Sequence, residues 1–171
     1  MDFFNLAKRR YSVRAFSDRP VEREKLDLMM EAGNAAPTAK NIQPQRVYVV
    51  QSKERLAALA ELCPCLYGAG TVLVFAYDED AAWTNPMEQG IGAGVEDVSI
   101  VATHVMLQAA ELGLGTCWVN YFANSKVEKA LSLPENERVV LLMPVGYPAE
   151  EARPSVNHAA RKPLSDTVTY L

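Results

Sequence analysis

The most regular pattern of apolar positions lies in residues 91–112. Apolar side chains recur there at alternating spacings of four and three residues, which is the period of an α-helix. They are Ile91, Val95, Val98, Ala102, Val105, Ala109 and Leu112. Ile100, Val101 and Leu107 add apolar positions on other faces, so the sequence predicts a buried helix over residues 95–112. Either a second subunit covers part of this helix or it is the central helix of a monomer, and the pattern favours the dimer.

Helical and strand-like patterns follow one another along the rest of the chain. Helices are expected over residues 2–8, 21–34, 52–62 and 125–131, and strands over residues 46–50, 71–77, 116–120 and 139–147. Ser125 and Glu128 have the spacing of a capping box, and Pro144 is expected to break the last strand. The tail from residue 148 onward has little periodicity and must pack on something to be ordered. No repeat or linker divides the sequence, so residues 1–171 form one predicted domain.

The charge is distributed unevenly, with an excess of basic residues near the start of the chain. The chain carries a net charge of −4, but its first 25 residues hold seven Lys or Arg and four Asp or Glu, a local charge of +3 that leaves −7 for the remainder. A nucleic-acid surface needs basic charge spread over a face, so this asymmetry argues against nucleic-acid binding and for one local anion site. No apolar run reaches the roughly 18 residues of a membrane span, and Asp2 and Asn5 interrupt any signal peptide. We therefore expect a cytoplasmic protein with no membrane segment.

The three cysteines do not have the spacing of a known metal or redox motif. Cys63 and Cys65 are separated by one residue rather than two, and Cys117 is distant in sequence. The two histidines, His104 and His158, are also far apart, so we expect no metal site. Free cysteines often pack as small buried residues, which is our interpretation of all three. A thiol oxidoreductase using Cys63 and Cys65 remains an alternative.

The local basic charge is concentrated in residues 9–14 (RRYSVR). Arg9, Arg10 and Arg14 present planar forks of donors that match phosphate oxygens, and Ser12 adds a hydroxyl donor. This group could hold one phosphate. It could also be a solvated basic end of the preceding helix, where arginine favours the negative end of the helix dipole. The residues of this segment alone favour the second interpretation.

Four segments of the chain occur in an order and at separations that resemble the nitroreductase family, flavoproteins that hold FMN at a dimer interface. They are residues 9–16 (RRYSVRAF), 36–44 (APTAKNIQP), 109–118 (AAELGLGTCW) and 161–164 (RKPL). Together they span nearly the whole chain. The resemblance implies an α+β fold in which helices flank a central mixed β-sheet. It also implies an intertwined homodimer with the long helix at its core.

The resemblance assigns the cofactor-binding residues. Arg10, Ser12 and Arg14 match residues that hold the FMN phosphate and ribityl chain, and Arg161 completes the phosphate clamp. A loop of the other subunit reaches the flavin, and the turn after the long helix lies beside the isoalloxazine ring. The full expected set is Arg9, Arg10, Tyr11, Ser12, Arg14, Pro37, Thr38, Asn41, Gln43, Thr116, Cys117, Trp118 and Arg161. With the resemblance counted, the phosphate interpretation of residues 9–14 is the favoured one.

Two positions depart from the family pattern. Gln45 stands where relatives often have an aromatic residue, which is expected to loosen the packing around the loop that ends at Pro44. Ala159 stands where some relatives have a second basic residue, so the phosphate clamp is expected to be present but weaker.

The implied function is an FMN-dependent oxidoreductase. Hydride from NADH or NADPH would pass through the flavin to nitroaromatic, quinone-like or other electron-poor small molecules. The flavin carries this chemistry, so we assign no catalytic acid or base. Tyr67, Trp83 and Tyr121 are candidates to line the substrate face. The alternatives are a specialised flavin reduction such as reductive dehalogenation, and a flavin-binding protein without enzymatic activity.

Overall fold

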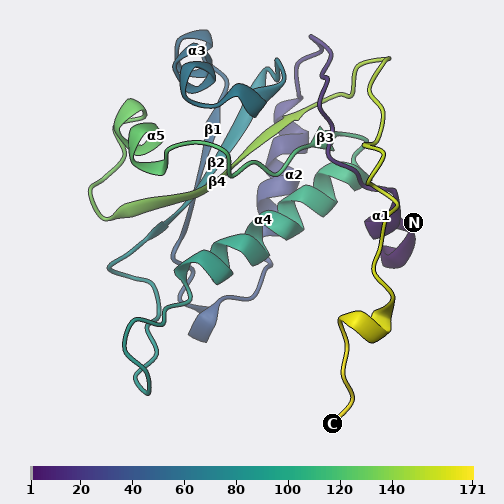
Figure 1. The fold of residues 1–171 in the computed structure, drawn as a ribbon. Helices are drawn as coiled ribbons and strands as arrows, with labels where there is room; N and C mark the ends of the chain where they lie inside the picture. Colours follow the sequence, from purple (N-terminus) through teal and green to yellow (C-terminus); the bar gives the residue numbers. More distant parts are fainter. Residues whose placement is uncertain (1) are drawn as a thin grey trace.

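Four strands form one sheet in the order β1-β2-β4-β3. The structure is a computed structural model that describes residues 2–171 (Figure 1). The strands are β1 (Gln45–Val50), β2 (Thr71–Asp78), β3 (Gly115–Thr116) and β4 (Glu137–Gly146). Every neighbouring pair of strands runs antiparallel. The α+β architecture expected from the sequence is therefore confirmed.

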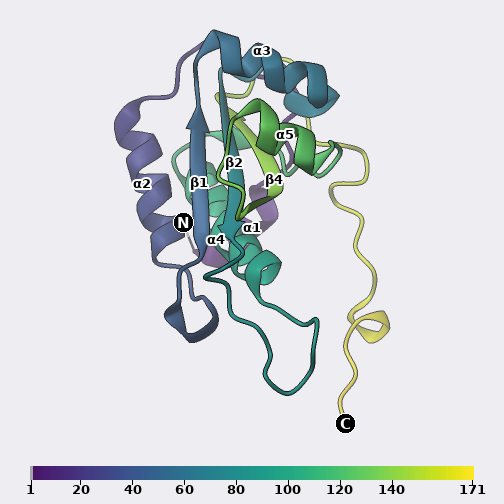
Figure 2. The same ribbon diagram turned by 90° about the vertical axis from the view of Figure 1, so that its left-hand side faces the viewer.

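Helices cover both faces of this sheet. They are α1 (Phe3–Arg9), α2 (Arg23–Asn34), α3 (Lys53–Leu62), α4 (Gly94–Glu111) and α5 (Asn124–Ala130). Short 3-10 turns occur at η1 (Ala39–Asn41), η2 (Pro64–Leu66) and η3 (Leu164–Asp166). Helices α2 and α4 pack on one face, while α3 and α5 pack on the other (Figures 1 and 2). The helices predicted from the sequence are all present.

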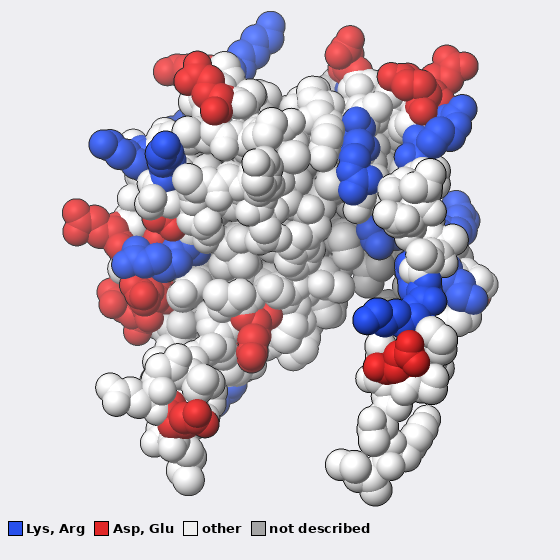
Figure 3. All heavy atoms as spheres, viewed as in Figure 1, with Lys and Arg blue, Asp and Glu red and all other residues white. Residues whose placement is uncertain are grey.

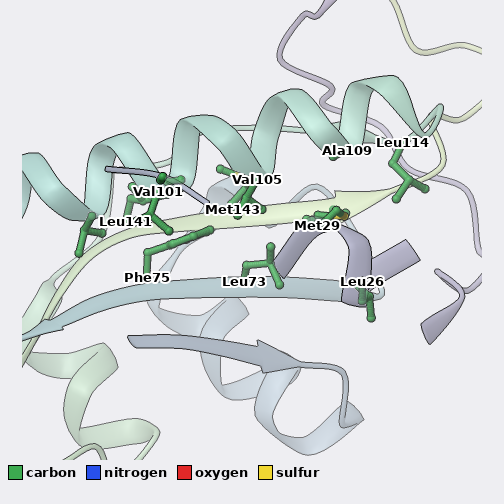
Figure 4. Close-up of a cluster of buried hydrophobic side chains, with 14 of the residues drawn as sticks. Leu26, Met29, Leu73, Phe75, Val101, Val105, Ala109, Leu114, Leu141 and Met143 are labelled. Carbon is green, nitrogen blue, oxygen red and sulfur yellow. The ribbon is translucent and has the colours of Figure 1, made fainter. Parts of the chain in front are cut away.

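The core has two layers because β2 is buried on both of its faces. Leu73 and Phe75 point toward α2 and α4, where they meet Val101 and Val105 of the long helix (Figure 4). The alternate residues of β2, such as Val74, point toward α3 and α5. Successive side chains of a strand point to opposite faces, so an uninterrupted apolar run is what a strand covered on both faces requires. Strand β2, together with β4 and α2, thereby holds α4 in place.

Part of α4 stays exposed. Val98, Ala102, Val105 and Ala109 are buried, as the sequence pattern predicts. Other apolar side chains on and just before the helix are at least a third exposed, namely Ile91 at 49%, Val95 at 54% and Ile100 at 38%. Ile91 precedes α4, which begins at Gly94, and Val95 lies in the first turn of the helix with its side chain exposed. In the view of Figure 1, the middle of this face is uncharged and most charged side chains lie around its margin (Figure 3).

The prediction of a mixed sheet is wrong for the four strands described. Strand β2 begins at the end where β1 finishes, since Val50 pairs with Val72. The intervening α3 and η2 turn the chain around at that end instead of carrying it across the sheet, so the two strands run antiparallel. Within residues 2–171, the parallel pairing is confined to an isolated bridge between Ser12 and Thr116.

Three local predictions also need correction. Of the expected 116–120 strand, only Thr116 lies in a strand, as the second residue of β3, and Val119 adds an isolated bridge. The capping box is absent, because Glu128 Oε1 accepts a hydrogen bond from Val139 N at 2.9 Å instead. Pro144 does not interrupt β4: it pairs with Val72, and its carbonyl accepts from Cys117 N at 3.3 Å.

A polar cluster fixes the C-terminal end of α4 against α2 and the end of β4. Lys25 Nζ donates to the Leu112 carbonyl at 3.0 Å and to the Tyr147 hydroxyl at 2.7 Å. The Tyr147 hydroxyl in turn donates to Glu22 Oε2 at 2.7 Å. A cation at the last carbonyls of a helix is favoured by the helix dipole. Gly113, with φ of +77°, then takes the left-handed conformation that turns the chain toward β3.

Replacing Glu22 by Gln is expected to lower stability at neutral pH but not at very low pH. The hydrogen bond from Tyr147, followed by those from the Glu22 backbone and Arg19, lowers the pKa of the Glu22 carboxyl from 4.5 to about 2. Its contribution is therefore complete above pH 4.5 and is lost as the pH falls toward 2. Denaturation midpoints of both proteins between pH 2 and 7 test this expectation. A difference that stays constant across that range would contradict it.

Candidate functional site

Residues 10–14 lie against the short strand β3. Val13 N donates to the Thr116 carbonyl at 2.9 Å, next to the bridge between Ser12 and Thr116. This approach needs a glycine, because a Cβ on Gly115 would lie 2.5 Å from the Val13 side chain. The pairing places the basic segment beside the chain that follows α4. The two segments are about a hundred residues apart in sequence.

The guanidinium groups at this place are not neutralised by the protein. Burial, and then the positive charge of Arg161, lower the pKa of the half-buried Arg10. Arg14 donates to the Ser12 carbonyl at 3.3 Å. Within residues 2–171, no ion pair or hydrogen bond joins Arg10, Arg14 or Arg161 to a carboxylate. Several cations held together without an anionic partner form a site that fits a phosphate group.

The C-terminal tail closes the other side of this site. A hollow of about 300 Å³ lies between the two segments and is lined by Arg10, Tyr11, Ser12, Arg14, Ser155, Asn157 and His158. The Tyr11 and His158 rings meet edge to face with their centroids 6.1 Å apart. Arg161 donates to the His158 carbonyl at 2.6 Å, which keeps it close to this hollow. The sequence prediction missed Ser155, Asn157 and His158, and the only available signal was their position just before Arg161.

Cys117 and Tyr67 lie beside the basic segment. Burial raises the pKa of the Cys117 thiol, and the nearby Arg14 and Ser12 only partly oppose this effect. Burial likewise raises the pKa of Cys63. Reactive cysteines have lowered pKa values, so these shifts argue against thiol chemistry. Tyr67 neighbours Cys65, Cys117 and Arg14, and burial raises its pKa as well.

The remaining aromatic candidates are spread over the molecule. Trp118 is half-buried, and its indole N–H donates to Asn120 Oδ1 at 2.6 Å. Tyr121 is 76% exposed. Trp83 lies in a separate hollow of about 490 Å³ near the start of α4, together with Tyr77 and Val95. The structure therefore places Trp83 far from the basic segment of the same chain.

The loop of residues 37–43 also lies at the start of α4. Ala39 N donates to Asp97 Oδ1 at 2.8 Å, whereas the hollow beside Arg9 and Arg10 is lined by Ala110 at the other end of the helix. At 1.5 Å per residue, Asp97 and Ala110 are about 20 Å apart along the helix axis. Pro37, Thr38, Asn41 and Gln43 consequently do not meet the arginines within one chain. Figure 1 shows η1 and α1 near opposite ends of α4.

Two further searches concern only the described part of the chain. No group of three or more His, Cys, Asp or Glu side chains in residues 2–171 could hold a metal ion. None of the helices described there has both the length and the apolar character to cross a membrane.

Comparison with known proteins decides the family. A model described as "Nitroreductase family" matches residues 7–66 and residues 60–147, which together are most of the chain. The chain belongs to the nitroreductase family. The resemblance inferred from the sequence is thereby confirmed, and three of its four segments lie within the matched residues. The fourth, residues 161–164, follows the last matched residue of the family model.

Individual nitroreductase relatives agree over nearly the full length. A nitroreductase family protein of Clostridium difficile 630 has a crystal structure with a TM-score of 0.92 and 39% sequence identity, covering 99% of this chain and 98% of that one. A protein named FMN-dependent nitroreductase, from Clostridium difficile R20291, has a TM-score of 0.80 and 28% identity over 98% of each chain. A relative from Methanothermobacter thermautotrophicus is 31% identical over 159 residues, which are 88% of this chain and 79% of the relative. Its name provisionally describes an NADH dehydrogenase or NAD(P)H nitroreductase.

Replacing Gly115 by Ala is expected to separate the basic segment from β3. The new Cβ would overlap Val13, so we expect a loss of about 1–3 kcal/mol in the free energy of unfolding. The Val13 amide should also exchange faster with solvent, because its hydrogen bond to Thr116 would lengthen. Denaturation curves and hydrogen exchange measure the two effects.

Gly70→Ala is the matched control for this substitution. A Cβ at Gly70 would meet no described atom within 4 Å, and its backbone does not have a positive φ. We expect Gly70→Ala to leave both measurements close to those of the original protein. Equal effects of the two substitutions would show that the close approach of Val13 is unimportant.

Proposed function

We propose that this protein is an FMN-dependent oxidoreductase that transfers hydride from NADH or NADPH to small electron-poor acceptors. Nitroaromatic and quinone-like compounds are the acceptor classes that this proposal includes. The observation that carries it is a group of unneutralised arginines: Arg10 and Arg14 line a hollow of about 300 Å³, and the charge of Arg161 acts on Arg10. A phosphate monoester of the size found in FMN fits the charge and the donors of this hollow.

The relatives support this choice of cofactor and electron donor. The Clostridium difficile R20291 protein, 28% identical, is named as FMN-dependent. A relative from Staphylococcus haemolyticus is named an NADPH-dependent oxidoreductase, at 27% identity over 86% of this chain and 65% of its own length. Since the names of relatives differ in the nicotinamide that they mention, either donor is consistent with them.

Different residues of the site would bind different parts of FMN. Arg10, Ser12, Arg14 and Arg161 would bind the phosphate, while residues 116–118 would lie along the isoalloxazine ring. Bound FMN would supply the hydride chemistry, and the protein would orient the ring and exclude water. Cys117 and Thr116 are buried beside Ser12, so the backbone there is held rigidly enough to orient a ring.

We further propose that the active protein is a homodimer, because the expected site is incomplete in one chain. The loop of residues 37–43 and the arginines are held apart by about 20 Å of α4. A second copy packed on exposed apolar residues of α4, such as Ile100, could bring its own loop to the arginines. The tail of residues 164–171 also extends away from the body with Leu164, Tyr170 and Leu171 exposed (Figures 1 and 2). Such a tail is well suited to wrap around a second copy.

Other functions receive less support. Raised pKa values of Cys63 and Cys117 argue against a thiol oxidoreductase. Reductive dehalogenation and cofactor storage would use the same FMN site, and no observed contact favours either. Turnover with NADH and a panel of acceptors separates these alternatives from the proposed activity.

The first test is the FMN content of the purified protein. We expect one FMN per chain, and we expect Arg10→Ala to weaken FMN binding by about 10–150-fold through the loss of charge-assisted hydrogen bonds. Titration followed by flavin fluorescence measures the affinity. Arg55→Ala removes an exposed arginine of α3 outside the site and should leave the affinity unchanged. A protein that does not bind added FMN would overturn the proposal.

Electron transfer is the second part of the same test. Under anaerobic conditions, NADH or NADPH should bleach the bound flavin, and a nitroaromatic or a quinone should restore its colour. Stopped-flow absorbance records both half-reactions separately. Bound flavin that stays oxidised with both nicotinamides would contradict the proposed donor and favour a protein without this activity.

The dimer is tested by the mass in solution, which should be twice the chain mass of 18.8 kDa. Ile100→Glu places a charge on the exposed side of α4 and should weaken association by about 3–5 kcal/mol, because the charge would be buried without a partner. Ala57→Glu, on an exposed position of α3, is the matched control. Sedimentation equilibrium measures both variants. A wild-type monomer that binds FMN fully would contradict the proposed shared site.

A further inference from the structure

The loop of residues 37–43 has a conformation that its own hydrogen bonds only partly explain. Thr38 Oγ1 accepts from Gln43 N at 3.1 Å, and the Thr38 carbonyl accepts from Asn41 N at 2.9 Å. Nevertheless Lys40, Asn41 and Gln43 have φ values of 51°, 56° and 58°, in the left-handed region that non-glycine residues seldom adopt. Such a backbone persists when its surroundings hold it in place.

Asp97 provides the contact that holds this loop. Among the hydrogen bonds of the described residues, the bond from Ala39 N to Asp97 Oδ1, at 2.8 Å, is the one that joins residues 37–43 to the rest of the chain. Asp97 itself is 3% exposed and lies in the first turns of α4, where its amide donates to the Ala93 carbonyl at 2.7 Å. The loop is therefore tied to the long helix of the core.

The second oxygen of Asp97 distinguishes it from an ordinary helix-capping acid. Oδ2 is buried and has no hydrogen-bond partner among the described residues. A buried carboxylate with an unpaired oxygen disfavours folding, and an apolar side chain would pack there at lower cost. A role limited to packing therefore does not account for an acid at this position. A carboxylate does, however, accept a stronger hydrogen bond from the loop amide than a neutral group would.

We infer that Asp97 is a positioning residue of the flavin site, which holds the loop of residues 37–43 so that Thr38 and Asn41 meet the flavin bound by the other copy. This inference rests on the proposed FMN-dependent function and on the proposed dimer. Asp97 does not touch the cofactor in this arrangement. It acts through the amide of Ala39, from the opposite end of α4 to the arginines that bind the phosphate.

Two substitutions remove the same hydrogen bond from its two sides. Asp97→Leu removes the acceptor while keeping a side chain of similar size. Ala39→Pro removes the donor, and it suits the backbone: Ala39 begins η1, and Thr38 before it is already extended at φ −132° and ψ 160°. Both should weaken FMN binding about tenfold or more and shift the reduction potential of the flavin, as expected for a lost charge-assisted bond. The double variant should be no worse than either single one.

Two other variants serve as controls for this experiment. Asp97→Asn keeps an oxygen that can accept from Ala39 N but loses the charge, so its FMN affinity and potential should lie between those of the original protein and those of Asp97→Leu. Glu96→Gln makes the same change of charge on the neighbouring exposed residue and should have no effect. Thermal unfolding of each variant without FMN shows how much of any change is a loss of stability. If Asp97→Leu alone weakens FMN binding and Ala39→Pro does not, the effect does not pass through the loop, and the inference is wrong.

A mixed dimer tests whether the loop acts on the other copy. One chain carries Arg10→Ala and the other carries Asp97→Leu, with different purification tags. If the loop serves the other copy, one site combines intact arginines with an intact loop, and half of the chains should bind FMN with the original affinity and potential. If no site of original affinity is found, Asp97 does not act across the dimer. Absence of FMN binding in the unmodified protein is a different result, and it would overturn the proposed function itself.

Discussion

The packing of α4 between the central sheet and α2 is the constraint on which the rest of the structure depends. Phe75 and Met143 of the sheet contact the same side of α4 as Met29 of α2 (Figure 4). The helices approach closely at Gly33, where a Cβ would lie 2.7 Å from Val105. A helix held along its whole length cannot bend to bring its ends together. Every residue attached near one end therefore keeps its distance from those attached near the other.

Charge at the two ends of α4 is balanced in different ways. The C-terminal carbonyl of Leu112 receives a hydrogen bond from Lys25, and the first turns contain the buried carboxylate of Asp97. Both charges suit the helix dipole and come from the chain itself. Arg10, Arg14 and Arg161 lack such a partner among the described residues, and burial, followed by the charge of Arg161, lowers the pKa of Arg10. An anion that binds between these cations decreases their mutual repulsion. The positive charge that the fold leaves unpaired there therefore favours binding of a phosphate.

The sequence allowed good predictions wherever a local pattern and the tertiary structure agree. The period of α4 and the uninterrupted apolar run of β2 both reflect burial, and both elements were found. Glu128 shows the opposite case, since its spacing from Ser125 suits a capping box but a strand amide competes successfully for its carboxylate. Asp97 could not be distinguished in advance from an acid that merely favours the start of a helix. His158 lies in an aperiodic tail, and only the folded chain brings it to Tyr11.

In the proposed dimer, cofactor binding and association must strengthen each other. If one copy supplies Arg10 and Arg14 while the other supplies Thr38 and Asn41, FMN binds the dimer more tightly than it binds either copy alone. Thermodynamic linkage then requires each bound FMN to tighten the dimer by the same factor. The rigid α4 is what makes this coupling necessary, because a flexible connection would let one chain fold its own loop back onto its own arginines. In the proposed dimer, a long core helix thus makes association a requirement for a complete flavin site.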